Sequence, residues 1–123
     1  MSNALRILTV DDSASMRALL LHALSSRGFD VVQADDGQAA LQWLVTNDVD
    51  VIITDINMPR LDGFGLIERL RSGERHCDRP ILVLSTESSD EKKARARAAG
   101  ATGWIVKPFD ADKLVAAVRR VAH

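Results

Sequence analysis

Short apolar runs of this sequence are followed at once by side chains that could do chemistry together. These side chains are a pair of carboxylates, a third carboxylate, a hydroxyl and an ammonium group: Asp11 and Asp12, Asp55, Ser85, and Lys107. Three carboxylates that lie close together repel one another unless a cation compensates them. Mg²⁺ suits such a set, because it is usually held by one or two carboxylates together with waters or phosphate oxygens. The residues therefore predict a Mg²⁺ site, provided that the fold brings them together.

Asp55 is the carboxylate that we expect to react. A carboxylate can attack phosphorus and form an acyl phosphate, which is a known form of covalent catalysis. The metal ion and the ammonium group of Lys107 would then neutralise charge on the transferring phosphoryl oxygens. The Ser85 hydroxyl could donate a hydrogen bond to one of those oxygens after the transfer.

The segments that must position these side chains alternate between two patterns. Apolar, β-branched runs predict five strands, at Leu5–Val10, Val31–Ala34, Val49–Thr54, Ile81–Ser85 and Gly103–Val106. Helical spacing and capping residues predict five helices, at about Ala14–Arg27, Gln38–Thr46, Phe64–Arg71, from Ser88-Ser89-Asp90 to Gly100, and after Asp110. This alternation favours an open α/β sheet with helices on both faces. Ligands of such sheets bind beyond the carboxyl ends of the strands, where the reactive side chains fall.

The first helix and the histidines give two further expectations about burial. The apolar stripe of the first helix is expected to face the core, and it consists of Met16, Leu19, Leu20, Ala23 and Leu24. The histidines show no metal-ligand spacing and are expected at the surface: His22, His76 and His123. Trp43 is expected to pack partly against the core.

Length and composition limit the remaining function classes. The 123 residues fit one domain, spanning 1–123, and 46% of them are hydrophobic. The formal net charge of -1 does not resemble that of a general nucleic-acid binder. The single cysteine, Cys77, excludes an internal disulfide. We see neither a signal-peptide pattern nor an apolar run of about 20 residues, so we expect a cytoplasmic protein without a membrane partner.

The same residues carry a family resemblance. In order and spacing, Asp11-Asp12, Asp55, Ser85 and Lys107-Pro108 resemble the receiver domain of two-component response regulators, and the match covers essentially the whole chain. Three stretches are most similar to the stand-alone chemotaxis regulators of that family: 11–17 (DDSASMR), 55–59 (DINMP) and 106–109 (VKPF). The resemblance implies a flavodoxin-like (βα)₅ fold, with a five-stranded parallel sheet in the strand order 2-1-3-4-5.

The resemblance also implies a role for each residue of the site. Asp55 would accept the phosphoryl group from a histidine kinase or a phosphotransfer protein. Asp12 and Asp55 would bind Mg²⁺ through their side chains and Asn57 through its backbone carbonyl, while Asp11 would act through metal-bound water. Lys107 would contact the phosphoryl group, and its peptide bond to the following proline would be cis.

Other positions would carry the signal outward. The resemblance makes Ser85 the switch hydroxyl and Trp104 the switch aromatic, and it makes Asn57 and Glu87 the residues that tune removal of the phosphoryl group by water. The fourth helix, fifth strand and fifth helix would bind an output partner protein, with the flagellar motor switch as one candidate. The chain would catalyse only its own phosphorylation and dephosphorylation, and would not be an enzyme in the ordinary sense.

Three positions near the site depart from the commonest family pattern. Ser85 replaces the commoner Thr but keeps the hydroxyl. Trp104 stands where Tyr or Phe is more usual, and a full indole is a tight fit for the inward pocket of the switch aromatic. Thr86 stands where Ala or Gly is frequent, and its branched side chain is expected to restrict access to Asp55. The basic residues of the fourth helix fit either a solvated face or a docking surface: Lys92, Lys93, Arg95 and Arg97.

Three alternative functions use the same fold class. An aspartate-nucleophile phosphatase would need an Asp-x-Asp pattern after the first strand, but Ser13 occupies the second Asp position. A flavodoxin-like cofactor binder would need a phosphate loop where Asp11 and Asp12 stand, and these carboxylates would repel a phosphate. A receiver that serves as a phosphate sink or a phosphorelay shuttle, without motor output, fits the sequence as well as a chemotaxis regulator does.

Overall fold

Strands and helices alternate along the whole of the described chain. The computed structural model describes residues 4–122. The strands are β1 (Arg6–Val10), β2 (Asp30–Ala34), β3 (Val51–Thr54), β4 (Ile81–Ser85) and β5 (Gly103–Val106). The helices are α1 (Ala14–Ser25), α2 (Gly37–Leu44), α3 (Gly63–Ser72), α4 (Asp90–Ala99) and α5 (Ala111–Val121). The strands form one parallel sheet in the order β2-β1-β3-β4-β5, which confirms the expected fold class and strand order.

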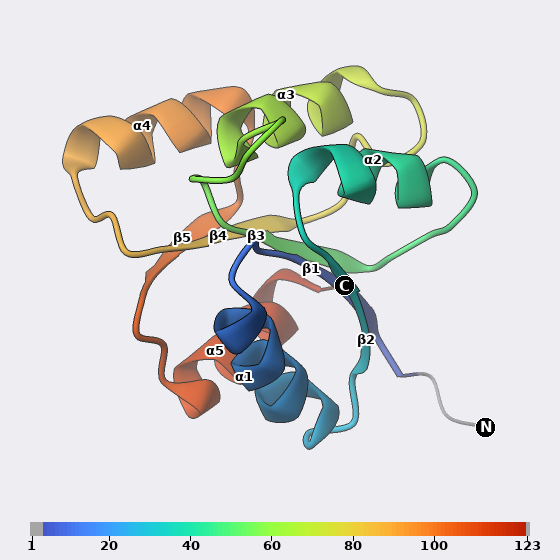
Figure 1. The fold of residues 1–123 in the computed structure, drawn as a ribbon, viewed down its shortest axis with the longest axis vertical. Helices are drawn as coiled ribbons and strands as arrows, with labels where there is room; N and C mark the ends of the chain where they lie inside the picture. The colour runs from blue at the N-terminus through green and yellow to red at the C-terminus, as the bar shows by residue number, and fades with distance from the viewer. Residues whose placement is uncertain (1–3, 123) are drawn as a thin grey trace.

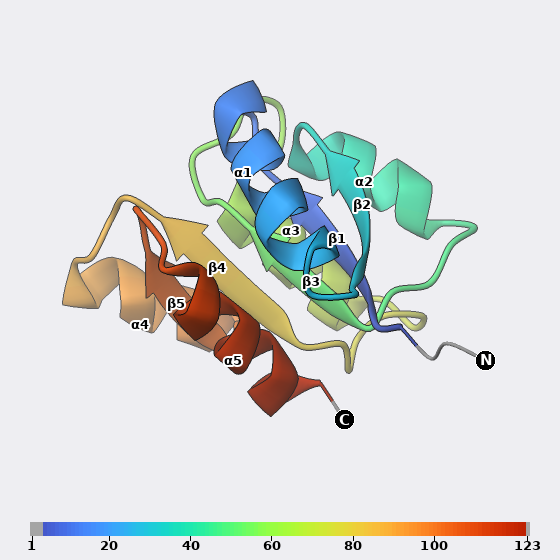
Figure 2. The same cartoon turned by 90° about the horizontal axis from the view of Figure 1, so that it is seen from below.

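The helices cover both faces of the sheet (Figure 1). Helices α2, α3 and α4 lie on one face and α1 and α5 on the other, and the view turned by 90° shows the same division (Figure 2). Each face has its own apolar core, because Leu8 and Ile52 point to the first set of helices while Ile7 and Ile53 point to the second. This alternation of side chains along a strand explains why β1 and β3 are mostly apolar.

The register of the strands brings their carboxyl ends to one edge. Val10 of β1 pairs with Thr54 of β3, and Thr54 pairs with Val83 of β4. Strands β3 and β4 are buried over their full length. The residues that follow β1, β3 and β4 therefore emerge next to one another from the most buried part of the sheet.

Each helix begins at a side-chain cap. The N-cap residues accept a hydrogen bond from the backbone N–H three positions later, and they are Ser13, Asp36, Asp62, Ser89 and Asp110. Such caps satisfy N–H groups that have no partner within the helix, so they fix where each loop at the carboxyl edge ends. Asp110 and the Ser88-Ser89-Asp90 cluster begin helices where the sequence predicts them.

Two burial expectations are wrong. Leu19 is 57% exposed, because α1 presents only a narrow stripe to the sheet, formed by Leu20, Ala23 and Leu24. His76 is buried in the loop between α3 and β4, where its Nε2 lies 3.0 Å from the Leu44 carbonyl oxygen. A polar ring can be buried in a loop when such partners are available.

The other expectations about these side chains hold where they can be examined. Trp43 is half-buried and packs against the core beneath α2, and His22 is exposed. His123 lies outside the described residues. Within residues 4–122, no helix is both long enough and apolar enough to cross a membrane.

Gly100, the C-cap of α4, gives a test of how tightly α3 and α4 are joined. Its φ is 118°, and a Cβ there would lie 2.5 Å from Cγ of Arg71, whose guanidinium donates to three backbone carbonyls. We expect Gly100→Ala to lower the free energy of unfolding by about 2–3 kcal/mol in urea denaturation, since strain and displacement of Arg71 add.

Gly28 is the matched control for this substitution. Its φ is 89°, but no atom lies within 4 Å of where a Cβ would stand. Gly28→Ala should therefore cost only the strain of the left-handed backbone, about 1 kcal/mol. Equal losses for the two variants would show that contact with Arg71 contributes nothing.

Candidate functional site

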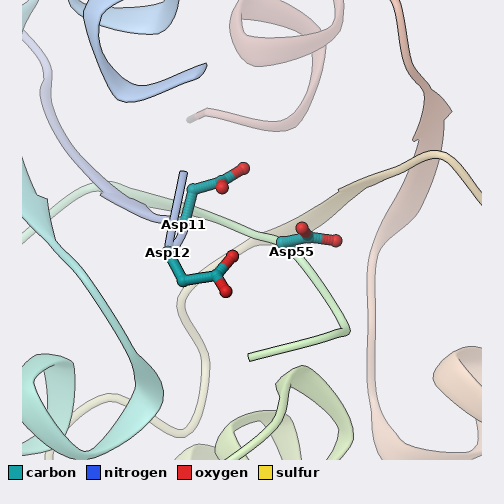
Figure 3. Close-up of side chains that lie close together, drawn as sticks. All are labelled: Asp11, Asp12 and Asp55. Carbon is teal, nitrogen blue, oxygen red and sulfur yellow. The ribbon is translucent and has the colours of Figure 1, made fainter. Parts of the chain in front are cut away.

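Three carboxylates meet at the carboxyl edge of the sheet. Asp11 and Asp12 follow β1, and Asp55 follows β3; one oxygen from each lies within 4.8 Å of the others. The side chains of Asp11 and Asp12 project toward the side on which Asp55 lies (Figure 3). Asp11 and Asp55 are buried, whereas Asp12 is exposed. The structure thus brings together the three carboxylates among the residues that the sequence assigns to the metal site.

Backbone hydrogen bonds hold the two buried carboxylates in place. The Asp11 N–H donates to the carbonyl of Ala34 at 3.1 Å, and the Ser13 N–H donates to Oδ1 of Asp11 at 2.9 Å. The Ile56 N–H donates to Oδ1 of Asp55 at 2.7 Å. In both carboxylates the Oδ1 atom is occupied by a backbone donor, which leaves Oδ2 directed at the centre of the cluster.

Lys107 occupies that centre. Its Nζ lies 2.8 Å from Oδ2 of Asp11 and 3.0 Å from Oδ2 of Asp55. The backbone N–H of Lys107 donates to the carbonyl of Ser85 at 2.8 Å, and its bond to Pro108 is cis, as expected. Burial lowers the pKa of Lys107, but the hydrogen bonds to the two carboxylates outweigh it, so its pKa is raised above the ordinary value.

The charges of the cluster are unbalanced. Lys107 offsets only one of three negative charges, and Asp12 adds its carboxylate from the solvent side. Buried like charges are costly unless a cation compensates them. The donors are all carboxylate oxygens. Such oxygen ligands suit hard divalent ions better than they suit transition metals. A hard divalent cation fits this site.

Ser85 and Trp104 are joined through the backbone of Glu87. The Ser85 side chain is fully buried at the end of β4, and its Oγ accepts the N–H of Glu87 at 3.2 Å. The indole N–H of Trp104 donates to the carbonyl of Glu87 at 2.9 Å, and this tryptophan is half-buried. Thr86 lies between Ser85 and Glu87 and is exposed.

Glu87 also reaches across to the loop after β3. Its Oε1 accepts a long hydrogen bond from Nδ2 of Asn57 at 3.4 Å, and its other oxygen forms an ion pair with Lys92 of α4. The hydrogen bond from Lys92 lowers the pKa of Glu87 most, and that from Asn57 adds to the effect. The two residues expected to tune dephosphorylation are therefore neighbours, and Glu87 connects them to Lys92 near the start of α4.

Three further side chains that support the site and its loops were missed by sequence reasoning. Arg17 of α1 donates to the carbonyl of Asp11 at 2.6 Å, and Gln33 of β2 donates to the carbonyl of Arg17 at 2.6 Å. Arg60 in the loop after β3 pairs with Asp36. These contacts join residues 6, 16 and 24 positions apart, and no spacing rule indicates them.

Comparisons with known proteins agree with this geometry. Residues 7–119 match the response regulator receiver domain family. Chemotaxis protein CheY-3 of Vibrio cholerae is 40% identical over 111 residues, which cover 89% of this chain and 85% of that protein. The structure of CheY4 of Vibrio cholerae has a TM-score of 0.92 and 42% identity, covering 96% of this chain and 98% of that one.

A third relative was solved with a metal ion. The receiver domain of sensor histidine kinase PA1611 from Pseudomonas aeruginosa PAO1 has a magnesium ion coordinated in its active site cleft. It matches with a TM-score of 0.89 and 25% identity, covering 96% of this chain and 97% of that one.

The matches to this fold and sequence define a class of protein, the phosphorylation-dependent modules of two-component signalling. The chain belongs to the response regulator receiver domain family. Members of this family are signalling proteins and not metabolic enzymes.

Replacing Lys107 tests the charge balance of the cluster. Without metal at pH 7, Lys107→Met should lower the free energy of unfolding by about 3 kcal/mol, because Asp11 and Asp55 lose their shared cation. Lys113→Met, on the exposed side of α5, makes the same change in net charge and should have little effect. Urea denaturation in a chelator measures both.

The difference in unfolding free energy between wild type and Lys107→Met should depend on pH, because the pKa of Lys107 is raised. The contribution of Lys107 is complete below the unfolded-state pKa of about 10.4 and is lost as the pH rises through the higher folded-state pKa. The gap in unfolding free energy between wild type and Lys107→Met should therefore be constant near neutral pH and close only above about pH 10.4. A gap that closes between pH 6 and 8 would contradict this assignment.

Proposed function

We propose that this chain is a phosphorylation-activated response regulator in which Asp55 accepts a phosphoryl group in a Mg²⁺-dependent reaction. The observation that carries the proposal is the convergence of three carboxylates and Lys107 at the carboxyl edge of the sheet. Family membership supplies the reaction class. The proposed ligands of Mg²⁺ are the side chains of Asp12 and Asp55 and the backbone carbonyl of Asn57, with Asp11 acting through metal-bound water.

The proposed chemistry assigns one role to each side chain. A carboxylate oxygen of Asp55 forms a bond to phosphorus while the bond between phosphorus and the histidine nitrogen of the donor breaks, and that nitrogen keeps the electron pair. Asp55 is already oriented by the Ile56 N–H and needs no proton removed, because it reacts as a carboxylate. Bound Mg²⁺ supplies positive charge to the phosphoryl oxygens, and Lys107 adds a second cation.

The same residues support a switch. When the Ser85 hydroxyl turns to a phosphoryl oxygen, the N–H of Glu87 loses its acceptor. Glu87 also binds Trp104 through its carbonyl and Lys92 through its carboxylate. Phosphorylation would thereby change the balance between two arrangements of the output face formed by α4, β5 and α5.

The output face would bind a partner protein. The basic residues Lys93 and Arg97 line a small hollow between α4 and β5 together with Trp104. Similarity to chemotaxis proteins of the CheY type favours a cytoplasmic chemotaxis role, with the flagellar motor switch as the output partner and a histidine kinase as the donor. A phosphate sink or phosphorelay shuttle is the alternative. In this proposal, residues 1–123 form one receiver domain. That domain binds proteins, and it binds neither nucleic acid nor a membrane.

Intact mass measurement tests the phosphoryl acceptor. Incubated with Mg²⁺ and a small acyl phosphate donor, the wild type should gain one phosphoryl group. Asp55→Asn should gain none, since its amide is not a nucleophile, and a chelator should abolish the gain in the wild type. Labelling of Asp55→Asn at the wild-type level would refute the assigned acceptor.

Thr86→Ala tests whether the branched side chain beside Ser85 restricts access to Asp55. The alanine variant should be phosphorylated faster by the small donor, with the same Mg²⁺ requirement, because its side chain lacks the branch. Ser88→Ala, in the same exposed loop, is the control and should react at the wild-type rate. Equal rates for Thr86→Ala and wild type would show that Thr86 does not limit access.

A further inference from the structure

Arg60 has an unusual backbone conformation close to the site. Its φ is 67°, and within residues 4–122 it is the one residue other than glycine with a positive φ. This left-handed conformation costs a branched or long side chain about 1–2 kcal/mol. It persists only where surrounding contacts outweigh that cost, so the contacts of Arg60 are informative.

The side chain of Arg60 is directed at a buried carboxylate. Its Nε lies 2.6 Å from Oδ2 of Asp36, and its Nη2 contacts the same oxygen. Asp36 is only 3% exposed and also caps α2, accepting the Ala39 N–H at 2.8 Å on Oδ1. Burial raises the pKa of Asp36, but the Ala39 N–H and the Arg60 guanidinium outweigh it and hold the pKa below its ordinary value. The buried carboxylate of Asp36 therefore has two partners, the Ala39 N–H on Oδ1 and the Arg60 guanidinium on Oδ2.

A second contact joins the same two segments next to this ion pair. A Cβ on Gly37 would lie 2.7 Å from the carbonyl oxygen of Leu61, so the first turn of α2 lies directly against the backbone that follows Arg60. The loop between β3 and α3 is thus held to α2 at two successive residues, once by charge and once by close packing.

That loop carries Asn57, the proposed carbonyl ligand. It begins at Asp55, and at its other end the Gly63 N–H donates to the carbonyl of Ile56 at 2.9 Å. The exposed Asn57 lies between these fixed points, only three residues before Arg60. The contacts of Arg60 and Leu61 with α2 therefore restrain the part of the loop that lies farther from the sheet.

We propose that Arg60 and Asp36 are a positioning pair that fixes the loop after β3, so that the backbone carbonyl of Asn57 is directed at the divalent cation. The inference rests on the proposed function, because it needs that cation and that ligand. Neither side chain touches the cation or the phosphoryl group; they act through the backbone between 57 and 60.

Electrostatics and positioning predict opposite signs for the loss of Arg60, which makes the inference testable. Removing a positive charge near an acidic cluster should strengthen Mg²⁺ binding if charge alone matters. Losing the restraint on the carbonyl ligand should weaken it, and supporting residues of metal sites typically contribute about 10-fold or more in affinity.

The experiment compares Mg²⁺ dissociation constants, measured by NMR titration of the backbone amides, and initial rates of phosphorylation by the small donor. Arg60→Gly removes the pair and also accommodates the positive φ, so the folded state should be kept. We expect it to bind Mg²⁺ about 10-fold more weakly, with partial recovery in Arg60→Lys, which restores the charge. Arg69→Gln on α3 removes the same charge from an exposed site and should bind as the wild type does.

The outcomes separate the two proposals. If wild type takes up a phosphoryl group with Mg²⁺ but Arg60→Gly binds Mg²⁺ as tightly as wild type or more tightly, the positioning pair is refuted and the proposed function stands. If wild type neither binds Mg²⁺ nor is phosphorylated, both are refuted, because no cation is present for the pair to serve. The positioning role of Arg60 and Asp36 is supported if Arg60→Gly binds Mg²⁺ more weakly than wild type, Arg60→Lys recovers part of the affinity, and Arg69→Gln keeps the wild-type affinity.

Discussion

The structure depends on an electrostatic imbalance at the carboxyl edge of the sheet. Asp11 and Asp55 are buried next to each other and share one ammonium group, that of Lys107, while Asp12 adds a third negative charge. Such an arrangement costs stability in the absence of a further cation. The same charge imbalance favours binding of a divalent cation, and the proposed phosphoryl transfer would use the positive charge of that cation. The negative charge of the site is thus only partly compensated until a further cation binds.

Only a rigid scaffold can keep like charges this close. The sheet provides it, because β3 and β4 are buried along their full length and their register aligns the strand ends. Backbone N–H groups then occupy one oxygen of each buried carboxylate, from Ser13 to Asp11 and from Ile56 to Asp55. Relaxation by rotation of either side chain would break these bonds, so the repulsion is not relieved by local movement.

The sequence predicts the fold and the site well because both follow from one rule. Buried parallel strands are mostly apolar, so a polar or charged residue at or just after the end of each strand marks the carboxyl edge, and Asp11, Asp55 and Ser85 all lie there. Contacts between loops follow no such rule. The Arg60 to Asp36 ion pair joins residues 24 positions apart, and the burial of His76 depends on a carbonyl of α2. Both depend on loop conformations, for which periodicity gives no signal.

Few residues lie between the acid cluster and the proposed output face, and Glu87 connects them. Glu87 contacts Asn57 in the loop after Asp55, the Ser85 hydroxyl, and two of the three elements of the proposed output face, α4 at Lys92 and β5 at Trp104. Its ion pair with Lys92 is on the surface and contributes little to stability, while the indole donor of Trp104 is half-buried and contributes about 1 kcal/mol. Contacts of this size can be exchanged by one new hydrogen bond at Ser85. A stronger network would hold the proposed output face in a single arrangement, so weak contacts at Glu87 suit the proposed reversible switch.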